Sequence, residues 1–189
     1  MKEQLQKDFD NIIKNLSLSQ RDTEIKQFYL DNFINKGFPN RRDENWKFSD
    51  LNQIIKKNIG ELSFYNDYTS TSKVDTSVFV DGLEHNKIVF INGRIEKIDF
   101  DYEKKDQIEI IDKSETINKF NNNNSLSDLN NAFTNKSFKI IVKNGYQLVK
   151  PLIIYHITNS DIWSKNINLR LDFELGKDSS LRLIDLYND

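Results

Sequence analysis

Residues 87–94 read Lys87-Ile88-Val89-Phe90-Ile91-Asn92-Gly93-Arg94, and this stretch decides how the middle of the chain folds. An apolar run rich in β-branched residues leads into Asn92-Gly93, and a second β-rich run extends from residue 94 to residue 100. Asn and Gly both tolerate the positive φ angles that a type I′ turn requires at its two central positions. The sequence therefore predicts a β-hairpin that turns near residue 92.

The chain after the hairpin has mainly a β pattern. Residues 167–175 alternate apolar and polar side chains, so one face of that strand is expected to be buried and the other solvated. A strand is also predicted at residues 107–111, a weak helix at 114–120 before an asparagine run at 121–124, and a capped short helix at 126–133. Further strands are predicted at 137–143, 146–150, 152–157 and 180–187. Their spacing fits a sandwich or the coils of a β-solenoid, and periodicity does not choose between them.

The chain before the hairpin is expected to be helical. One face of a first helix is apolar, at Leu5, Phe9, Ile12, Ile13 and Leu16. A second helix is predicted to pack against the first as a hairpin, and a third, shorter helix follows. Candidate caps and stops for the second and third helices are Ser19 with Asp22, Gly37, Ser49 or Asp50, and Gly60. Residues 63–81 show no clear period and are interpreted as an extended connector.

The junction between the second and third predicted helices, residues 38–51, combines a proline, charged residues and aromatic rings. Pro39 cannot continue a helix, so the backbone must turn there. Trp46 is interpreted as a core residue, with a contact to a partner protein as the alternative. Local ion pairs are expected among four neighbouring charged residues, Arg41, Arg42, Asp43 and Glu44.

Composition limits the possible functions. The chain has 189 residues, which corresponds to one or two domains, and its 27 basic and 29 acidic residues give a net charge of -2. There is thus no broad positive field for nucleic acid. The chain has no cysteine, which rules out disulfides and thiolate ligands from this chain. No leader-like or membrane-spanning apolar segment is found, and a cytoplasmic location is expected.

The junction resembles SufD-type members of the SufB/SufD family, which belongs to the SUF system of iron–sulfur cluster assembly. In this family a proline, a basic pair and an acidic-x-Trp-Lys-aromatic-Ser/Thr-x-Leu string follow an opening helical segment, as residues 39–51 do here. Three later segments resemble the family in the same order along the chain. They are residues 87–94; residues 129–133 with the strands at 139–142 and 151–154; and residues 168–187.

The resemblance implies an α+β fold in which a small amino-terminal helical domain precedes the first coils of a right-handed parallel β-helix, with the Asn-Gly hairpin near residue 92. The expected divisions are a helical domain at 1–62, a mixed connector with the hairpin and short helices at 63–136, and the start of the β-helix at 137–189. Because family members are longer and continue the β-helix, the chain is expected to be an amino-terminal fragment or a truncated gene product.

The same resemblance implies a non-catalytic scaffold subunit. Its partners would be a SufB-like subunit and a SufC-like ATPase, contacted mainly through a carboxy-terminal part beyond these residues. An iron–sulfur cluster would be present at the level of the complex, with no cofactor bound by this segment. No catalytic, cofactor-binding or metal-binding residue is predicted in the chain.

Four residues are candidates for sites of chemistry. Asp172 and Glu174 share one strand face and could act as acid and base, but a solvated strand face is the preferred interpretation. His85 and His156 lack the spacing of a metal site, so His85 is expected on a turn and His156 in a strand with its ring hydrogen-bonded. The alternatives to a SUF scaffold are an unrelated β-solenoid or sandwich binding module with a helical collar, and an enzyme that uses Asp172 and Glu174.

Overall fold

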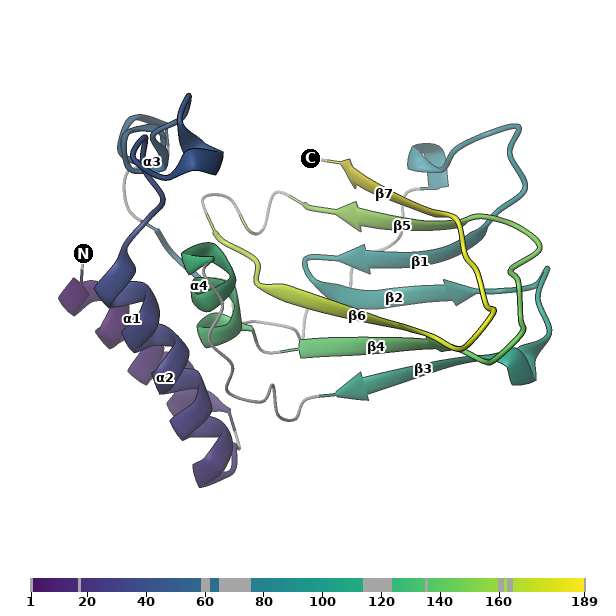
Figure 1. Ribbon diagram of the computed structural model, residues 1–189, viewed down its shortest axis with the longest axis horizontal. Coiled ribbons are helices and arrows are strands. Elements are labelled where there is room, and N and C mark those ends of the chain that lie inside the picture. Colours follow the sequence, from purple (N-terminus) through teal and green to yellow (C-terminus); the bar gives the residue numbers. More distant parts are fainter. Residues whose placement is uncertain are drawn as a thin grey trace. The chain divides into compact units, whose positions relative to one another are not determined.

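The computed structural model describes residues 2–16, 18–58, 62–64, 76–113, 124–134, 136–159, 162 and 165–188 (Figure 1). Within these residues the α-helices are α1 (Lys2–Asn15), α2 (Gln20–Lys36), α3 (Leu51–Asn58) and α4 (Ser125–Phe133). The strands are β1 (Asn86–Ile91), β2 (Arg94–Asp99), β3 (Ile108–Lys113), β4 (Lys136–Val142), β5 (Leu152–Ile157), β6 (Leu169–Leu175) and β7 (Leu183–Asn188). Short 3-10 helices are η1 (Glu44–Trp46), η2 (Thr76–Val78) and η3 (Lys105–Gln107). The α+β class predicted from the sequence is confirmed.

The strands form two open sheets with the orders β2-β1-β5-β7 and β3-β4-β6. Both sheets contain antiparallel pairs, β1 with β2 and β3 with β4, whereas β1 and β7 lie parallel to β5. The prediction of a right-handed parallel β-helix is therefore wrong, because the described strands form mixed sheets with free edges and no solenoid. The alternation of side chains along a strand sets its two faces but leaves the choice of neighbouring strand open.

The predicted hairpin is confirmed. Ile91 of β1 pairs with Arg94 of β2, and the two turn residues have positive φ angles, 50° at Asn92 and 80° at Gly93. The Asn92 side chain is buried and exchanges two hydrogen bonds with Asn159: its amide donates to the side-chain oxygen (2.8 Å), and it accepts from the Asn159 N–H (3.1 Å). Asn92 thus adopts the backbone conformation that the turn requires, and its side chain also holds the loop that contains Asn159.

Two strand predictions need correction. Residues 146–150 form no strand. Gln147 makes only an isolated bridge to Ser180, and the backbone N–H groups of Val149 and Lys150 donate to the Glu103 carboxylate. The predicted buried face of residues 167–175 is also absent, since every residue of β6 is partly buried or exposed. β6 lies at the edge of its sheet. Its side chains therefore have neighbours from one adjacent strand only, which leaves them more exposed than those of a central strand.

The chain divides into two units, each built from separate stretches. Unit 1 comprises Met1–Asn66, Ser114–Asn135 and Ser164–Arg170, and unit 2 comprises Asp67–Lys113, Lys136–Trp163 and Leu171–Asp189. The division predicted from the sequence was linear, and it did not place α4 with the amino-terminal helices. The predicted helix at 114–120, most of the asparagine run and residues 65–75 of the connector lie outside the described residues, as does the stop at Gly60.

Unit 1 has a core formed by α1, α2 and α4. The apolar stripe predicted for the first helix is confirmed in α1, and Ser19 caps α2 by accepting a hydrogen bond from the Asp22 N–H at 3.1 Å. Phe133 of α4 lies at the centre, stacked on Phe64 at 3.7 Å between ring centroids and edge-on to Phe9 at 6.0 Å. The most deeply buried apolar residues of unit 1 are Leu5, Phe9, Tyr29, Leu30, Phe33, Ala132 and Phe133.

Unit 2 is organised around β1 and β5, which lie side by side in the middle of the four-stranded sheet (Figure 1). Residues 152–155 are all buried, as are residues 88–91 of β1. A continuous apolar run is typical of a strand that is covered on both faces, and this explains why β5 lacks an alternating pattern. No α-helix in the described part of the chain combines the length and the apolar character that crossing a membrane requires.

Candidate binding site at the helical junction

The junction is a turn stabilised by its own hydrogen bonds. Gly37 has a φ of 73° and ends α2, with its N–H bonded to the Phe33 carbonyl at 2.6 Å. Phe38 then inserts its ring edge-on against Phe33, with 4.9 Å between centroids. The Asn40 N–H donates to the Asp43 carboxylate (2.8 Å), and the Asp43 N–H donates back to the Asn40 carbonyl (2.9 Å). The confirmed helix stop and this reciprocal pair hold the turn in one conformation.

A pocket of about 500 Å³ lies beside this turn, entirely within unit 1. Its lining comes from the end of α2, the turn, η1 and the start of α4: Lys36, Gly37, Phe38, Pro39, Asp43, Glu44, Asn45, Trp46, Asn124 and Ser125. Trp46 is partly exposed at this pocket and does not belong to the buried core, so the preferred core interpretation of this residue is wrong. Arg41 and Arg42 do not line it. The pocket is thus lined by aromatic and proline side chains together with one basic and two acidic side chains.

The Lys36 ammonium in the pocket wall is paired with a buried carboxylate. Its Nζ lies 2.9 Å from Oδ2 of Asp128, which is fully buried in α4, whereas the Lys36 side chain is 38% exposed. The other carboxylate oxygen, Oδ1, has no hydrogen-bond partner among the described residues. Asn124 caps α4 by accepting from the N–H groups of Leu126 (3.0 Å) and Ser127 (3.4 Å), which uses two of the free donors at the helix start.

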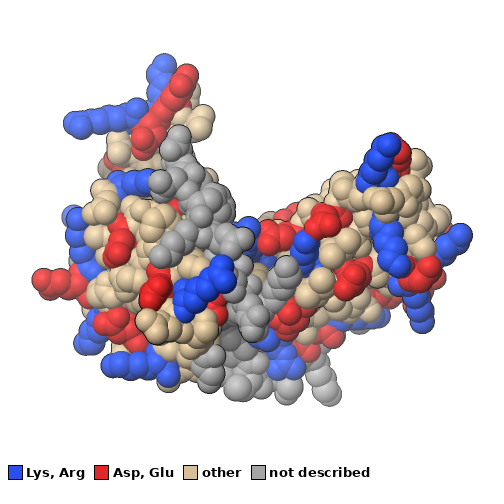
Figure 2. Space-filling model, turned by 60° about the horizontal axis from the view of Figure 1, so that its bottom comes forward, with Lys and Arg blue, Asp and Glu red and all other residues tan. Residues whose placement is uncertain are grey.

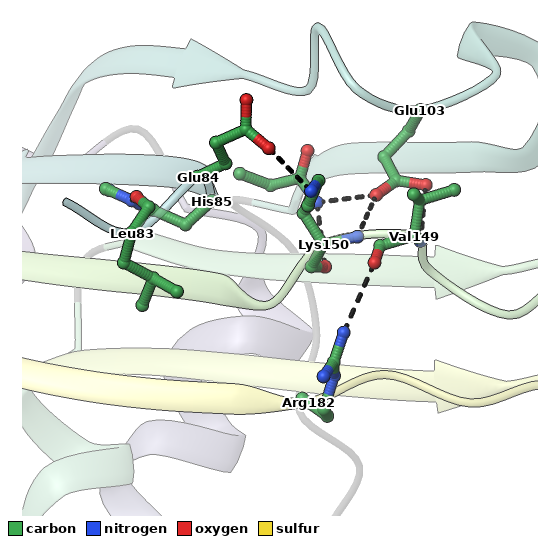
Figure 3. Close-up of polar contacts among 8 residues, drawn as sticks. Leu83, Glu84, His85, Glu103, Val149, Lys150 and Arg182 are labelled. Atoms are coloured by element: carbon green, nitrogen blue, oxygen red, sulfur yellow. Dashed lines mark hydrogen bonds and ion pairs between the residues drawn. The ribbon is translucent and has the colours of Figure 1, made fainter.

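A second polar cluster lies in unit 2, where the carboxylate of Glu103 fixes the turn before β5 (Figure 3). Glu103 is only 8% exposed. Its Oε1 accepts from the Asn86 amide (2.7 Å) and the Lys150 N–H (3.0 Å), and its Oε2 accepts from the Tyr146 hydroxyl (2.6 Å) and the Val149 N–H (3.1 Å). Four donors therefore converge on one buried carboxylate.

The donors around Glu103 stabilise its charged form. Burial raises the pKa of Glu103, but the hydrogen bonds from Tyr146, the Lys150 N–H and Asn86 outweigh burial, so the pKa lies below its usual value. Burial and the bond to Glu103 raise the pKa of Tyr146. Figure 3 also shows Lys150 paired with Glu84 (2.6 Å) and Arg182 donating to the Val149 carbonyl (3.2 Å).

The two histidines lie in different surroundings. His85 is buried just before β1; its Nδ1 lies 2.6 Å from the Leu83 carbonyl, and its Nε2 lies 2.8 Å from the hydroxyl of Tyr155, which accepts the Val80 N–H at 3.1 Å. Because Nδ1 faces a carbonyl it carries the proton, and Nε2 accepts from the tyrosine. The ring thus locks the segment before β1 onto β5.

His156 lies in β5 with its ring hydrogen-bonded, as predicted. Its Nε2 is 2.8 Å from Oδ1 of Asp185. The ring stacks between Phe90 of β1 (5.4 Å) and Tyr187 of β7 (4.5 Å), so an aromatic ladder crosses the three parallel strands. The two histidines therefore serve separate contacts and do not converge.

Asp172 and Glu174, which the sequence suggested as an acid and base pair, lie on the edge strand β6. Glu174 forms an ion pair with Lys139, and its side chain is 55% exposed. Neither residue lines the junction pocket. The described residues contain no group of three or more His, Cys, Asp or Glu side chains placed to hold a metal ion.

No family model matches the chain, and no curated protein matches it significantly. Sequence reasoning had singled out the junction but missed the Glu103 cluster and the pair of Lys36 with Asp128, because their partners come from distant parts of the chain. The sequence signal for this pair was weak: Asp128 stands in the first turn of a short capped helix, between Ser127 and Leu129.

Proposed function

We propose that this chain is a non-catalytic, cytoplasmic scaffold component of SUF-type iron–sulfur cluster assembly, acting with a SufB-like subunit and a SufC-like ATPase. The observation that carries the proposal is the junction at residues 38–51. It is the segment most similar to the SufB/SufD family, and its charged and aromatic side chains stand mainly at the surface, around a pocket, while its backbone is held by its own hydrogen bonds. Side chains arranged in this way are suited to contact with other proteins.

The polar clusters support a role in binding over a role in chemistry. Glu103, His85 and His156 each bond to neighbouring groups of the fold, and in each case the bonds stabilise a turn or a strand. The chain contains no cysteine, so a cluster assembled by the complex would take its thiolate ligands from a partner. The cluster is the product of the complex in this proposal and is not a cofactor of this chain.

Co-purification tests the proposal. The chain is co-expressed with the SufB-like and SufC-like proteins of the same genome, and an affinity tag on the SufC-like protein is used for capture. We expect the chain to be retained with both partners, and its depletion in cells to lower the activity of iron–sulfur enzymes. The proposal is wrong if the two partners are recovered together without this chain, and if depletion leaves those enzymes unaffected.

A binding module unrelated to SUF is the second candidate, and the pocket of about 500 Å³ is the observation that favours it. Such a module would bind its ligand without partners. A peptide and glycan array probed with the purified chain, beside a Trp46→Ala variant, distinguishes the two. Specific binding by the chain alone that is lost in the variant, together with failure of co-purification, would favour this second function.

A further inference from the structure

The sequence contains two Asn-Gly pairs, Asn92-Gly93 and Asn144-Gly145. In such a pair the backbone nitrogen of the glycine can attack the side-chain amide of the asparagine, because glycine has no side chain to hinder the approach. Each pair forms a turn in unit 2, and both glycines have positive φ angles, 80° at Gly93 and 73° at Gly145. The two pairs therefore share their chemistry but differ in their surroundings.

The Asn92 side chain is buried and held at both of its polar atoms. Its amide nitrogen donates to the side-chain oxygen of Asn159, and its oxygen accepts the Asn159 N–H. The backbone N–H of Asn92 also donates to the Ile157 carbonyl at 3.0 Å. Rotation of this amide toward the Gly93 nitrogen would break both side-chain bonds in the interior, where the freed groups would have no water to replace them.

Asn144 is exposed, and its side chain is held at the oxygen alone. Oδ1 accepts the Lys177 N–H at 2.8 Å, and no bond from Nδ2 to another described residue is present. A donor at Oδ1 stabilises the negative charge that develops there during attack. The Gly145 N–H donates to the Lys177 carbonyl at 2.7 Å, and this bond must open first. Because the turn is at the surface, its opening costs less free energy than opening of the buried turn at Asn92.

We propose that Asn144 is a site of spontaneous deamidation in the folded protein, and that the bonds to Asn159 protect Asn92 from the same reaction. The Gly145 nitrogen loses its proton to hydroxide and attacks Cγ of Asn144. A bond from nitrogen to Cγ forms, the bond from Cγ to Nδ2 breaks, and Nδ2 takes up a proton and leaves as ammonia. Water then opens the succinimide at either carbonyl, which leaves an aspartate or an isoaspartate at position 144.

The isoaspartate product should disturb the turn that packs on Asn144. A Cβ placed on Gly176 would lie 2.5 Å from both the backbone nitrogen and Oδ1 of Asn144, so residues 176–180 leave no space beside this residue. An isoaspartate adds one carbon to the backbone before Gly145, which moves the Gly145 N–H away from the Lys177 carbonyl. We therefore expect deamidation to loosen residues 176–180.

Ageing of the purified full chain in mildly alkaline buffer tests the proposal. Basic and acidic side chains intermingle on the face shown in Figure 2, and the net charge is -2, so ion exchange resolves a product with one more negative charge. Mass spectrometry of peptides assigns the change to Asn144 or Asn92. In the folded chain we expect Asn144 to react at least about tenfold faster, which requires a difference of about 1.4 kcal/mol in opening free energy. In urea, where both side chains are free, the two rates should become similar.

Two variants locate the reaction. Asn144→Gln should abolish the acidic product, because a glutamine side chain would have to close a larger ring. Asn159→Ala frees the Asn92 side chain and should raise its rate about tenfold, as expected when a protecting contact is lost. Asn15→Ala, which removes an exposed asparagine of α1, is the matched control and should change neither rate. Thermal unfolding checks that the variants fold, and the comparison with urea needs no variant.

Hydrogen exchange of the aged fraction tests the expected loosening. The N–H groups of Leu148 and Ser180 bond across the two turns, to the carbonyls of Ser180 (2.9 Å) and Tyr146 (3.1 Å), and should exchange faster after ageing. Equal rates at Asn144 and Asn92 in the folded chain, or an unchanged acidic product in Asn144→Gln, would overturn the deamidation site. Unchanged exchange at both N–H groups would overturn the loosening. These results do not depend on SUF partners, so the two proposals fail separately.

Discussion

Among the described residues, each unit of the molecule buries one carboxylate, and the two carboxylates are satisfied in different ways. Glu103 in unit 2 accepts four hydrogen bonds from neutral donors. Asp128 in unit 1 pairs with a single ammonium and keeps one oxygen without a partner among the described residues. A buried charge needs either several dipoles or one opposite charge, and the difference decides which substitutions the fold tolerates.

The largest effect is expected at the charge pair of unit 1. Replacing Lys36 with Met leaves Asp128 buried without its counter-charge, and we expect the free energy of unfolding to fall by about 3 kcal/mol. Asp128→Asn should cost only about 1 kcal/mol, because the partly exposed lysine can then reach water. Urea denaturation followed by circular dichroism measures both. If Asp128→Asn lowered the free energy of unfolding more than Lys36→Met does, an unpaired buried carboxylate would not be the more costly state.

Removing only the charge of Glu103 in unit 2 should lower the free energy of unfolding. Glu103→Gln places an amide NH2 against donors, and we expect a loss of about 2 kcal/mol. Because the pKa of folded Glu103 lies below its ordinary value of 4.5, the stability it contributes is present above that value and is lost as the pH falls through the folded pKa. The variant should lack this acid-dependent loss. Glu84→Gln, whose side chain is 65% exposed, is the control and should change stability little.

A third test uses Lys26, which donates to the carbonyls of Asn131 and Thr134 at the end of α4. Burial lowers its pKa to about 8 from 10.5, although nearby Asp22 raises it. Between these values the unfolded chain binds more protons than the folded chain, so stability should rise with pH, by at most about 1.4 kcal/mol per pH unit. Lys26→Met should remove that rise. Equal pH profiles of the two proteins between pH 8 and 10 would show that Lys26 is not buried in this way.

The smallest expected effect is that of Tyr146→Phe. The change removes one of the four donors to Glu103 and the acceptor of the Lys104 N–H, which lies 3.0 Å from the hydroxyl. The three remaining donors keep the carboxylate satisfied, so we expect a loss of about 1 kcal/mol. Thermal unfolding of Tyr146→Phe and Glu103→Gln, measured side by side, shows which variant is less stable. If the tyrosine variant were the less stable one, the carboxylate would not be the centre of the cluster.

Local structure could be predicted well from the sequence. The stripe of Leu5, Phe9 and Ile12, the Ser19 cap, the Gly37 stop and the Asn92-Gly93 turn all appear in the structure, because each depends on residues within one or two turns of backbone. The candidate site was predicted in part. The junction was recognised from its composition, but its pocket includes Asn124 and Ser125, which no local pattern connects to Trp46.

The sequence by itself determined most of the described helices, strands and turns, since hydrophobic periodicity and capping act over short distances, although it wrongly predicted a strand at residues 146–150. Only the tertiary structure decided that the strands pair in two open, mixed sheets and that β6 is an edge. The backbone groups of a strand are the same whatever its neighbour, so the choice of partner depends on how the remaining chain packs. For the same reason the donors that satisfy Glu103 and the lysine that pairs with Asp128 became visible only when distant segments were brought together.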